Sequence, residues 1–131
     1  MHLWSIILTA GQGSRLAEAT QGNRKQFLTW KGFPLFWHSA QKFAQVPAIE
    51  GIIFVFPQDP DQQWSVYVQE LNNRDNLGCH LKIANGGEQR QHSSYNGAIL
   101  LPPLCDAVLL HDAARPFLSA TLIHNIVQKL K

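Results

Sequence analysis

Four short and almost wholly apolar runs, separated by segments with helical spacing, most strongly constrain the fold of this chain. The runs span residues 3–8, 51–56, 81–84 and 107–110 and are rich in isoleucine, valine and leucine. Continuous apolar runs of this length are typical of strands buried on both faces, as in a parallel sheet. Their alternation with helices predicts an α/β domain of three layers, with a mostly parallel sheet covered by helices on both faces.

The segments between and after these runs carry helix signals. Pro34 suits a first helical turn, and apolar residues then recur on one face until Pro47 ends the pattern. Helical spacing returns over residues 64–71 and over residues 90–100, although an Asn-Gly pair weakens the second of these helices. Ser119 is placed to cap a fourth helix. The expected apolar stripe of that helix comprises Ile123, Ile126, Val127 and Leu130.

Length and composition limit the classes of protein to consider. A chain of 131 residues forms one domain at most and can bury a core. The net charge of +2 is too small to indicate nucleic acid as the partner. No apolar segment approaches the length of a membrane span, and the two distant cysteines do not suggest a disulfide framework. We therefore expect a cytoplasmic protein with reduced thiols.

Ligands of parallel sheets bind at the carboxyl ends of the strands, so the segments after the strands are the first candidates for a site. The first, residues 9–15, reads Thr-Ala-Gly-Gln-Gly-Ser-Arg. Gly11 and Gly13 alone indicate only a tight turn, but bare backbone N–H groups beside Arg15 can also bind phosphate. The segment is neither a Walker loop nor a complete dinucleotide fingerprint. Nearby lysines and arginines form a basic patch, for which a solvated face is the alternative interpretation.

The second segment, residues 85–93, contains two adjacent glycines, Gly86 and Gly87, and Ser93 at the start of the next predicted helix. Exposed backbone groups and one hydroxyl can read the edge of a nucleotide base. The alternative is an ordinary turn between a strand and a helix.

The third segment, residues 111–117, places Asp112 directly after an apolar strand. A carboxylate at this edge can hold a divalent cation, which in turn holds phosphate oxygens. A helix cap or an ion pair with Arg115 is the alternative. His111 alternates to the other face of the sheet and is expected to be structural.

Taken in order, four motifs carry a resemblance to a known family. The motifs TAGQGSRL, RKQFL, GGEQRQHSS and HDAARPF resemble those of the 2-C-methyl-D-erythritol 4-phosphate cytidylyltransferases of the non-mevalonate isoprenoid pathway. The resemblance covers nearly the whole chain, and HDAARPF is its most specific part. The similar ribitol-phosphate enzymes tend to differ at Thr9-Ala10-Gly11 and after Asp112, which favours the methylerythritol branch.

The resemblance implies a Rossmann-like nucleotidyltransferase fold, with residues 1–131 as the nucleotide-binding part of a truncated domain. Arg15 and Lys25 match a catalytic pair that stabilises charge at the α-phosphate of CTP. Asp112 matches a ligand of Mg²⁺ and, with Arg115, a contact to the second substrate in a homodimer. The implied nucleotide-binding residues are Ala10, Gly11, Gly13, Gly87, Glu88, Ser93 and Ala113.

The implied reaction is attack of a methylerythritol phosphate oxygen on the α-phosphorus of CTP, with release of pyrophosphate. Two departures from the family pattern bear on it. The segment between Arg15 and Lys25 is longer, with Arg24 in place of the usual proline, and the second half of the family domain is absent. We therefore expect the 131-residue chain to bind CTP with little turnover. A nucleotidyltransferase for another sugar phosphate and a non-catalytic nucleotide-binding module are the alternatives.

Overall fold

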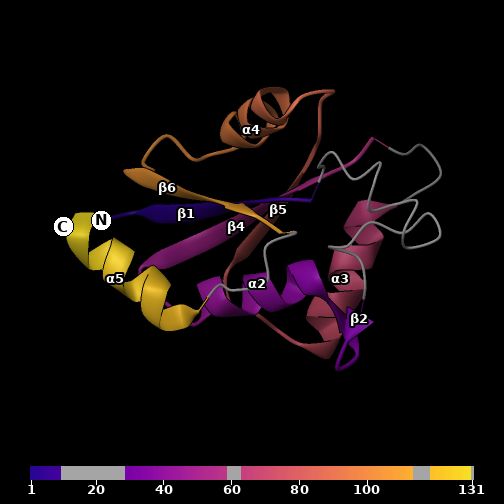
Figure 1. Ribbon diagram of the computed structural model, residues 1–131, viewed down its shortest axis with the longest axis horizontal. Helices are drawn as coiled ribbons and strands as arrows, with labels where there is room; N and C mark the ends of the chain where they lie inside the picture. Colours follow the sequence, from indigo (N-terminus) through magenta and orange to yellow (C-terminus); the bar gives the residue numbers. More distant parts are fainter. Residues whose placement is uncertain (10–28, 59–62, 114–118, 131) are drawn as a thin grey trace.

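A single parallel sheet of four strands organises the chain (Figure 1). The computed structural model describes residues 1–9, 29–58, 63–113 and 119–130. The strands of the sheet are β1 (Leu3–Leu8), β4 (Ile49–Phe56), β5 (His80–Asn85) and β6 (Ala107–Asp112). Their order is β5-β4-β1-β6, and every neighbouring pair is parallel. All four predicted strands are therefore confirmed.

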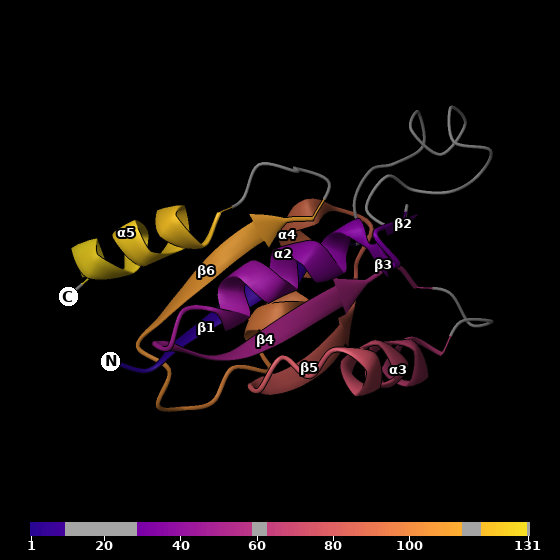
Figure 2. The same cartoon turned by 90° about the horizontal axis from the view of Figure 1, so that it is seen from below.

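Helices cover both faces of this sheet, as predicted (Figures 1 and 2). Helix α4 lies on one face and packs on β1, β4 and β5, whereas α2, α3 and α5 lie on the other face. The helices are α2 (Leu35–Ala44), α3 (Trp64–Arg74), α4 (Arg90–Ala98) and α5 (Ala120–Leu130). Among the described residues, no helix is both long and apolar enough to cross a membrane.

The apolar side chains form one core cluster on each face of the sheet. The larger cluster joins α2, α3 and α5 to the sheet, with Phe36 and Trp37 of α2 against Phe54 of β4. The smaller cluster lies on the α4 side and includes Trp4, Ile6 and Leu8. The two central strands, β1 and β4, therefore face apolar side chains on both sides, which explains their continuous apolar sequences.

A short hairpin before α2 was not predicted. It joins β2 (Thr29–Trp30) to β3 (Phe33–Pro34) through a turn in which both Lys31 and Gly32 have positive φ. Pro34 was expected inside the helix, but it pairs in this hairpin and precedes α2 with an extended ψ of 155°. Its fixed φ suits a helix, and its ψ places the residue one position before the helix begins.

The predicted apolar stripe of α5 is only half buried. Ile123 and Val127 are each 1% exposed, whereas Ile126 and Leu130 are 39% and 41% exposed. α5 packs mainly on α2, near the edge strand β6. The sheet ends at this strand, so the surface that faces α5 is too small to cover a stripe of four residues. The predicted cap is confirmed, because the Leu122 N–H donates to Ser119 Oγ at 3.1 Å.

Candidate functional site

The order of the strands places a topological switch point at the carboxyl ends of β1 and β6, and this edge is here called the crevice. β4 and β5 extend the sheet on one side of β1, and β6 pairs with its other side, so the direction of chain progression reverses at this point. In open α/β sheets, ligands bind at the carboxyl ends of the strands at such a reversal. Leu8 pairs with Asp112 there, and the Ala113 N–H donates to the Leu8 carbonyl at 3.0 Å.

The end of β1 is fixed by Thr9, the first residue of the first candidate loop. Thr9 is fully buried, and both its N–H and its Oγ1 donate to the carbonyl oxygen of Val55, at 2.9 and 2.6 Å. The chain therefore leaves the sheet from a defined position. Sequence analysis placed Thr9 in the loop but did not identify this anchoring role.

Asp112 and His111 project to opposite faces, as predicted. The Asp112 carboxylate lies on the side of α4, where Oδ2 is 3.2 Å from Nη1 of Arg90. The His111 ring lies on the side of α2, with Nε2 3.1 Å from the Ser39 hydroxyl and the ring against Phe43. The contacts of His111 with Ser39 and Phe43 are structural, and the Asp112 carboxylate lies at the carboxyl edge of the sheet.

The Arg90–Asp112 ion pair was missed by sequence analysis, which considered Arg115 as the partner of Asp112. Arg115 lies outside the described residues. Arg90 is the first residue of α4 and lies within the second candidate segment, residues 85–93, and its guanidinium connects this segment to the carboxyl end of β6. The presence of a cation within this candidate segment was the only sequence signal for the contact.

The second candidate loop is held closely by the structure around it. The Gly86 N–H donates to the Phe56 carbonyl at 2.6 Å, and the Gly87 N–H donates to Ser93 Oγ at 3.1 Å. Ser93 is fully buried beneath the loop, whereas Glu88 is exposed. A side chain at Gly87 would collide with His92, because a Cβ there would lie 2.3 Å from His92 Cβ. Glycine is therefore required by this packing.

Asn96 and Gly97, the pair that weakened the prediction of α4, help to fix the position of this helix on the sheet. Asn96 Nδ2 donates to the Asn85 carbonyl at 2.8 Å, at the end of β5. Gly97 allows α4 to approach the sheet, since a Cβ there would lie 3.0–3.1 Å from methyl groups of Val55 and Ile6. The helix is thus tied to the strands whose ends form the crevice.

The structure brings together five of the predicted site residues along one edge of the sheet. Gly87, Glu88 and Ser93 lie in the loop after β5 and the start of α4, whereas Asp112 and Ala113 lie at the end of β6. The remaining predicted residues lie outside the described part of the chain: Ala10, Gly11, Gly13, Arg15, Lys25 and Arg115.

Metal binding at this edge would depend on Asp112. Within the described ranges, no group of three or more histidine, cysteine, aspartate or glutamate side chains is arranged to hold a metal ion. Mg²⁺ is usually held by only one or two carboxylates together with phosphate oxygens of a substrate. A single, 32%-exposed carboxylate at the crevice fits that mode of binding.

The two cysteines do not suit nucleophilic chemistry. Burial raises the pKa of the Cys79 thiol, and burial is also the main cause of the raised pKa of Cys105. A raised pKa lowers the thiolate fraction at neutral pH, and the thiolate is the reactive form. The described residues therefore offer a carboxylate and backbone groups at the crevice, with no activated thiol.

A parallel sheet with a reversal of strand order, a glycine loop after β5 and a carboxylate at the end of β6 is typical of α/β domains that bind nucleotides. The family profile described as 2-C-methyl-D-erythritol 4-phosphate cytidylyltransferase matches residues 3–131. The chain therefore belongs to this family.

Curated relatives agree with the family match. The chain is 49% identical over its whole length to the bifunctional enzyme IspD/IspF of Oleidesulfovibrio alaskensis, of which it covers 33%. It is 34% identical to the 2-C-methyl-D-erythritol 4-phosphate cytidylyltransferase of Solibacter usitatus, with 96% of this chain and 52% of that protein covered. The chain thus spans about a third of the bifunctional relative and half of the other.

Solved structures show the same fold. The 4-diphosphocytidyl-2C-methyl-D-erythritol synthase of Anaerococcus prevotii superposes with a TM-score of 0.74 at 22% identity, covering 98% of this chain and 50% of that one. A CMP:2-keto-3-deoxy-manno-octonic acid synthetase complexed with CTP gives a TM-score of 0.68 at 15% identity, covering 99% of this chain and 47% of that one. The predicted Rossmann-like nucleotidyltransferase architecture is therefore confirmed.

Proposed function

We propose that this chain is the CTP-binding part of an enzyme that joins CTP to 2-C-methyl-D-erythritol 4-phosphate. The products are 4-diphosphocytidyl-2-C-methyl-D-erythritol and pyrophosphate, in cytoplasmic isoprenoid synthesis by the non-mevalonate route. The observation that carries the proposal is the position of the Gly86–Gly87 loop and Asp112 at the carboxyl edge of one sheet, connected through Arg90, in a chain that belongs to this family.

The described residues supply binding and orientation in this reaction. The Gly86 and Gly87 N–H groups are hydrogen-bonded within the protein, so the loop after β5 would offer the cytosine ring its carbonyl groups and its other N–H groups, with Glu88 exposed beside them. Buried Ser93 fixes the loop through the bond from the Gly87 N–H, so the loop is ordered before the nucleotide arrives. Such preorganisation lowers the entropic cost of binding.

Asp112 would bind Mg²⁺ at the other side of the crevice, beside the ribose and phosphates, with Ala113 next to it. The metal ion would neutralise negative charge on the phosphates. Phosphoryl transfer of this type needs little covalent participation from the protein, because alignment of two anions and neutralisation of their charge supply most of the rate. A carboxylate at the end of a strand paired along its length with β1 is a rigid support for that task.

The residues outside the described part complete the proposal through the family resemblance. Backbone groups of Ala10, Gly11 and Gly13 would bind the triphosphate of CTP, and Arg15 and Lys25 would stabilise charge at the α-phosphorus during attack. Arg115 would reach the phosphate of the second substrate within a homodimer.

Calorimetric titration of the chain with CTP, UTP, ATP and NAD, each with and without Mg²⁺, tests the proposal. We expect binding of CTP in preference to the other three, strengthened by Mg²⁺. A preference for UTP would instead favour a nucleotidyltransferase for another sugar phosphate. Absence of binding by all four nucleotides would refute the proposal and favour a non-catalytic module.

A further inference from the structure

Arg90 occupies a position that helix stability does not explain. It is the first residue of α4, the end at which the helix dipole is positive and a cation is unfavourable. No acidic residue lies in this first turn, and the preceding residue, Gln89, provides no side-chain cap. The charge of Arg90 therefore adds to the positive end of the helix without compensation from its own turn.

The ion pair with Asp112 does not explain the position through fold stability either. The Arg90 side chain is 58% exposed and that of Asp112 is 32% exposed, and they meet through a single Nη1–Oδ2 distance of 3.2 Å. Exposed pairs of this kind contribute little to the stability of a fold. A local function at the crevice is the remaining explanation.

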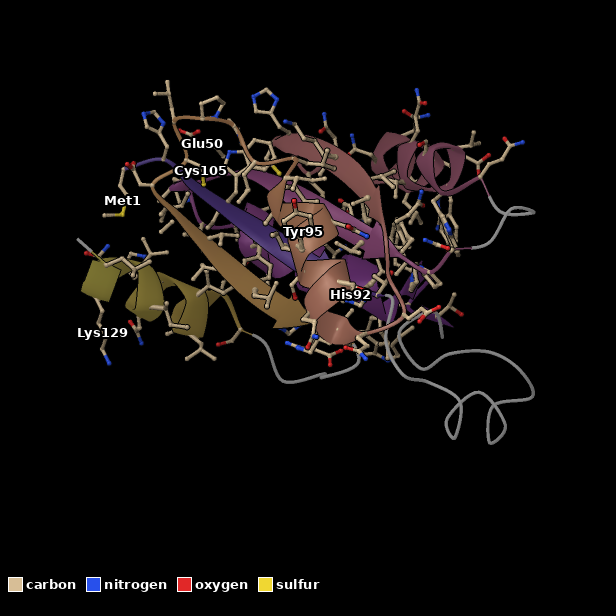
Figure 3. The ribbon with its side chains drawn as sticks, turned by 90° about the horizontal axis from the view of Figure 1, so that it is seen from above. Met1, Glu50, His92, Tyr95, Cys105 and Lys129 are labelled. Atoms are coloured by element: carbon tan, nitrogen blue, oxygen red, sulfur yellow. The ribbon has the colours of Figure 1, made fainter. Side chains whose placement is uncertain are left out.

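Arg90 connects the two described parts of the crevice. Figure 3 shows the start of α4, near the labelled His92, over the carboxyl end of β6. The turn that carries Arg90 is fixed by hydrogen bonds from the His92 and Ser93 N–H groups to the Gln89 carbonyl, both at 3.1 Å. A guanidinium on this fixed turn can hold Asp112 in a constant orientation relative to the loop after β5.

We propose that Arg90 is a positioning residue for the Asp112 carboxylate. By binding Oδ2, it limits the rotation of the carboxylate that would bind the metal ion accompanying the nucleotide. The inference rests on the proposed function, in which Asp112 binds Mg²⁺ with CTP.

The effect expected on binding follows from preorganisation. Without Arg90, the Asp112 side chain loses a contact that orders it before the ligand binds, and ordering one side chain on binding lowers affinity by about threefold to tenfold. We expect Arg90→Gln to weaken CTP binding by this factor in the presence of Mg²⁺ and by less than about twofold in its absence. Arg90→Lys should keep most of the affinity, because the pair is a single contact rather than a bidentate one.

Two further variants separate positioning from a general effect of charge. Arg74→Gln removes the same charge, but Arg74 contacts the Gly32 carbonyl and the Phe33 ring, so CTP affinity should not change. In an Asp112→Asn background, Arg90→Gln should cause no further loss, because the carboxylate through which Arg90 acts is gone.

Calorimetric titration of these variants with CTP, with and without Mg²⁺, and their melting temperatures decide the matter. An unchanged or higher affinity of Arg90→Gln for CTP with Mg²⁺ would overturn the inference, and so would an equal loss without Mg²⁺. A lower melting temperature in Arg90→Gln but not in Arg74→Gln would assign Arg90 a structural role instead. If the unsubstituted chain binds no CTP, the proposed function and the inference both fail, whereas CTP binding that Arg90→Gln leaves unchanged refutes the inference alone.

Discussion

Substitution of Gly87 by alanine tests the packing of the loop that we assign to the nucleotide base. A Cβ at this position would lie 2.3 Å from His92 Cβ and 3.3 Å from His92 Cγ. Non-bonded carbon atoms normally approach no closer than about 3.5 Å, so the two residues would have to separate by roughly 1 Å. Rotation of the His92 side chain cannot relieve this contact, because Cβ is fixed to the backbone of α4.

The size of the effect follows from these contacts. Overpacking of a well-packed site typically costs about 1–3 kcal/mol. A shift of the loop would also break the hydrogen bond from the Gly87 N–H to Ser93 Oγ, which is worth about 1 kcal/mol. We therefore expect Gly87→Ala to lower the free energy of unfolding by about 2 kcal/mol and to weaken CTP binding by about tenfold or more.

Urea unfolding and calorimetric titration with CTP measure the two quantities. Gln91→Ala is a suitable control, because Gln91 is exposed in the first turn of α4 and its substitution should change neither quantity. Unfolding and CTP binding of Gly87→Ala that match the unsubstituted chain would show that the loop does not pack on His92 as described.

Three further predictions concern the metal, the catalytic residues and the thiols. Asp112→Asn should reduce the Mg²⁺-dependent gain in CTP affinity while leaving the melting temperature nearly unchanged; a large loss of stability with an unchanged response to Mg²⁺ would favour a purely structural Asp112. In an enzyme extended to the length of the relatives, Arg15→Ala should lower kcat by orders of magnitude, because a preorganised charge contact contributes about 3–4 kcal/mol to transition-state stabilisation. A near-normal kcat would exclude Arg15 from the mechanism. Burial raises the pKa values of the Cys79 and Cys105 thiols, so both should react with a disulfide reagent at neutral pH more slowly than the thiol of a cysteine peptide. Their reaction rates should increase only as the pH rises. Rates equal to that of the peptide at neutral pH would contradict their burial.

The sequence predicted the central strands well because their environment leaves a clear pattern. β1 and β4 are buried on both faces, so nearly every position in them is apolar. The edge strands β5 and β6 extend beyond their apolar runs, to Asn85 and Asp112. Polar residues at these ends are strand residues because they pair with Phe56 and Leu8, and such pairing cannot be read from hydrophobicity.

The candidate site was predictable in its location but not in its contacts. Parallel topology places all strand exits at one edge, which brought the Gly86–Gly87 loop and Asp112 together as expected. The contact between Asp112 and Arg90 was missed because the two residues are 22 positions apart in sequence, and it depends on where α4 crosses the sheet. The role of Ser93 was likewise underdetermined, since its complete burial beneath the loop is a result of tertiary packing.

The central claim is that CTP binds at the carboxyl edge of the sheet, between β1 and β6. Titration of the isotope-labelled chain with CTP and Mg²⁺, followed through its amide resonances, tests this claim most directly. The largest changes should occur at Gly86–Gly87 and Asp112–Ala113, with little change at Glu50 and Asp106 near the opposite edge. Changes concentrated at that opposite edge, or in the groove between α3 and β5 lined by Val68, Asn72 and Leu81, would contradict it.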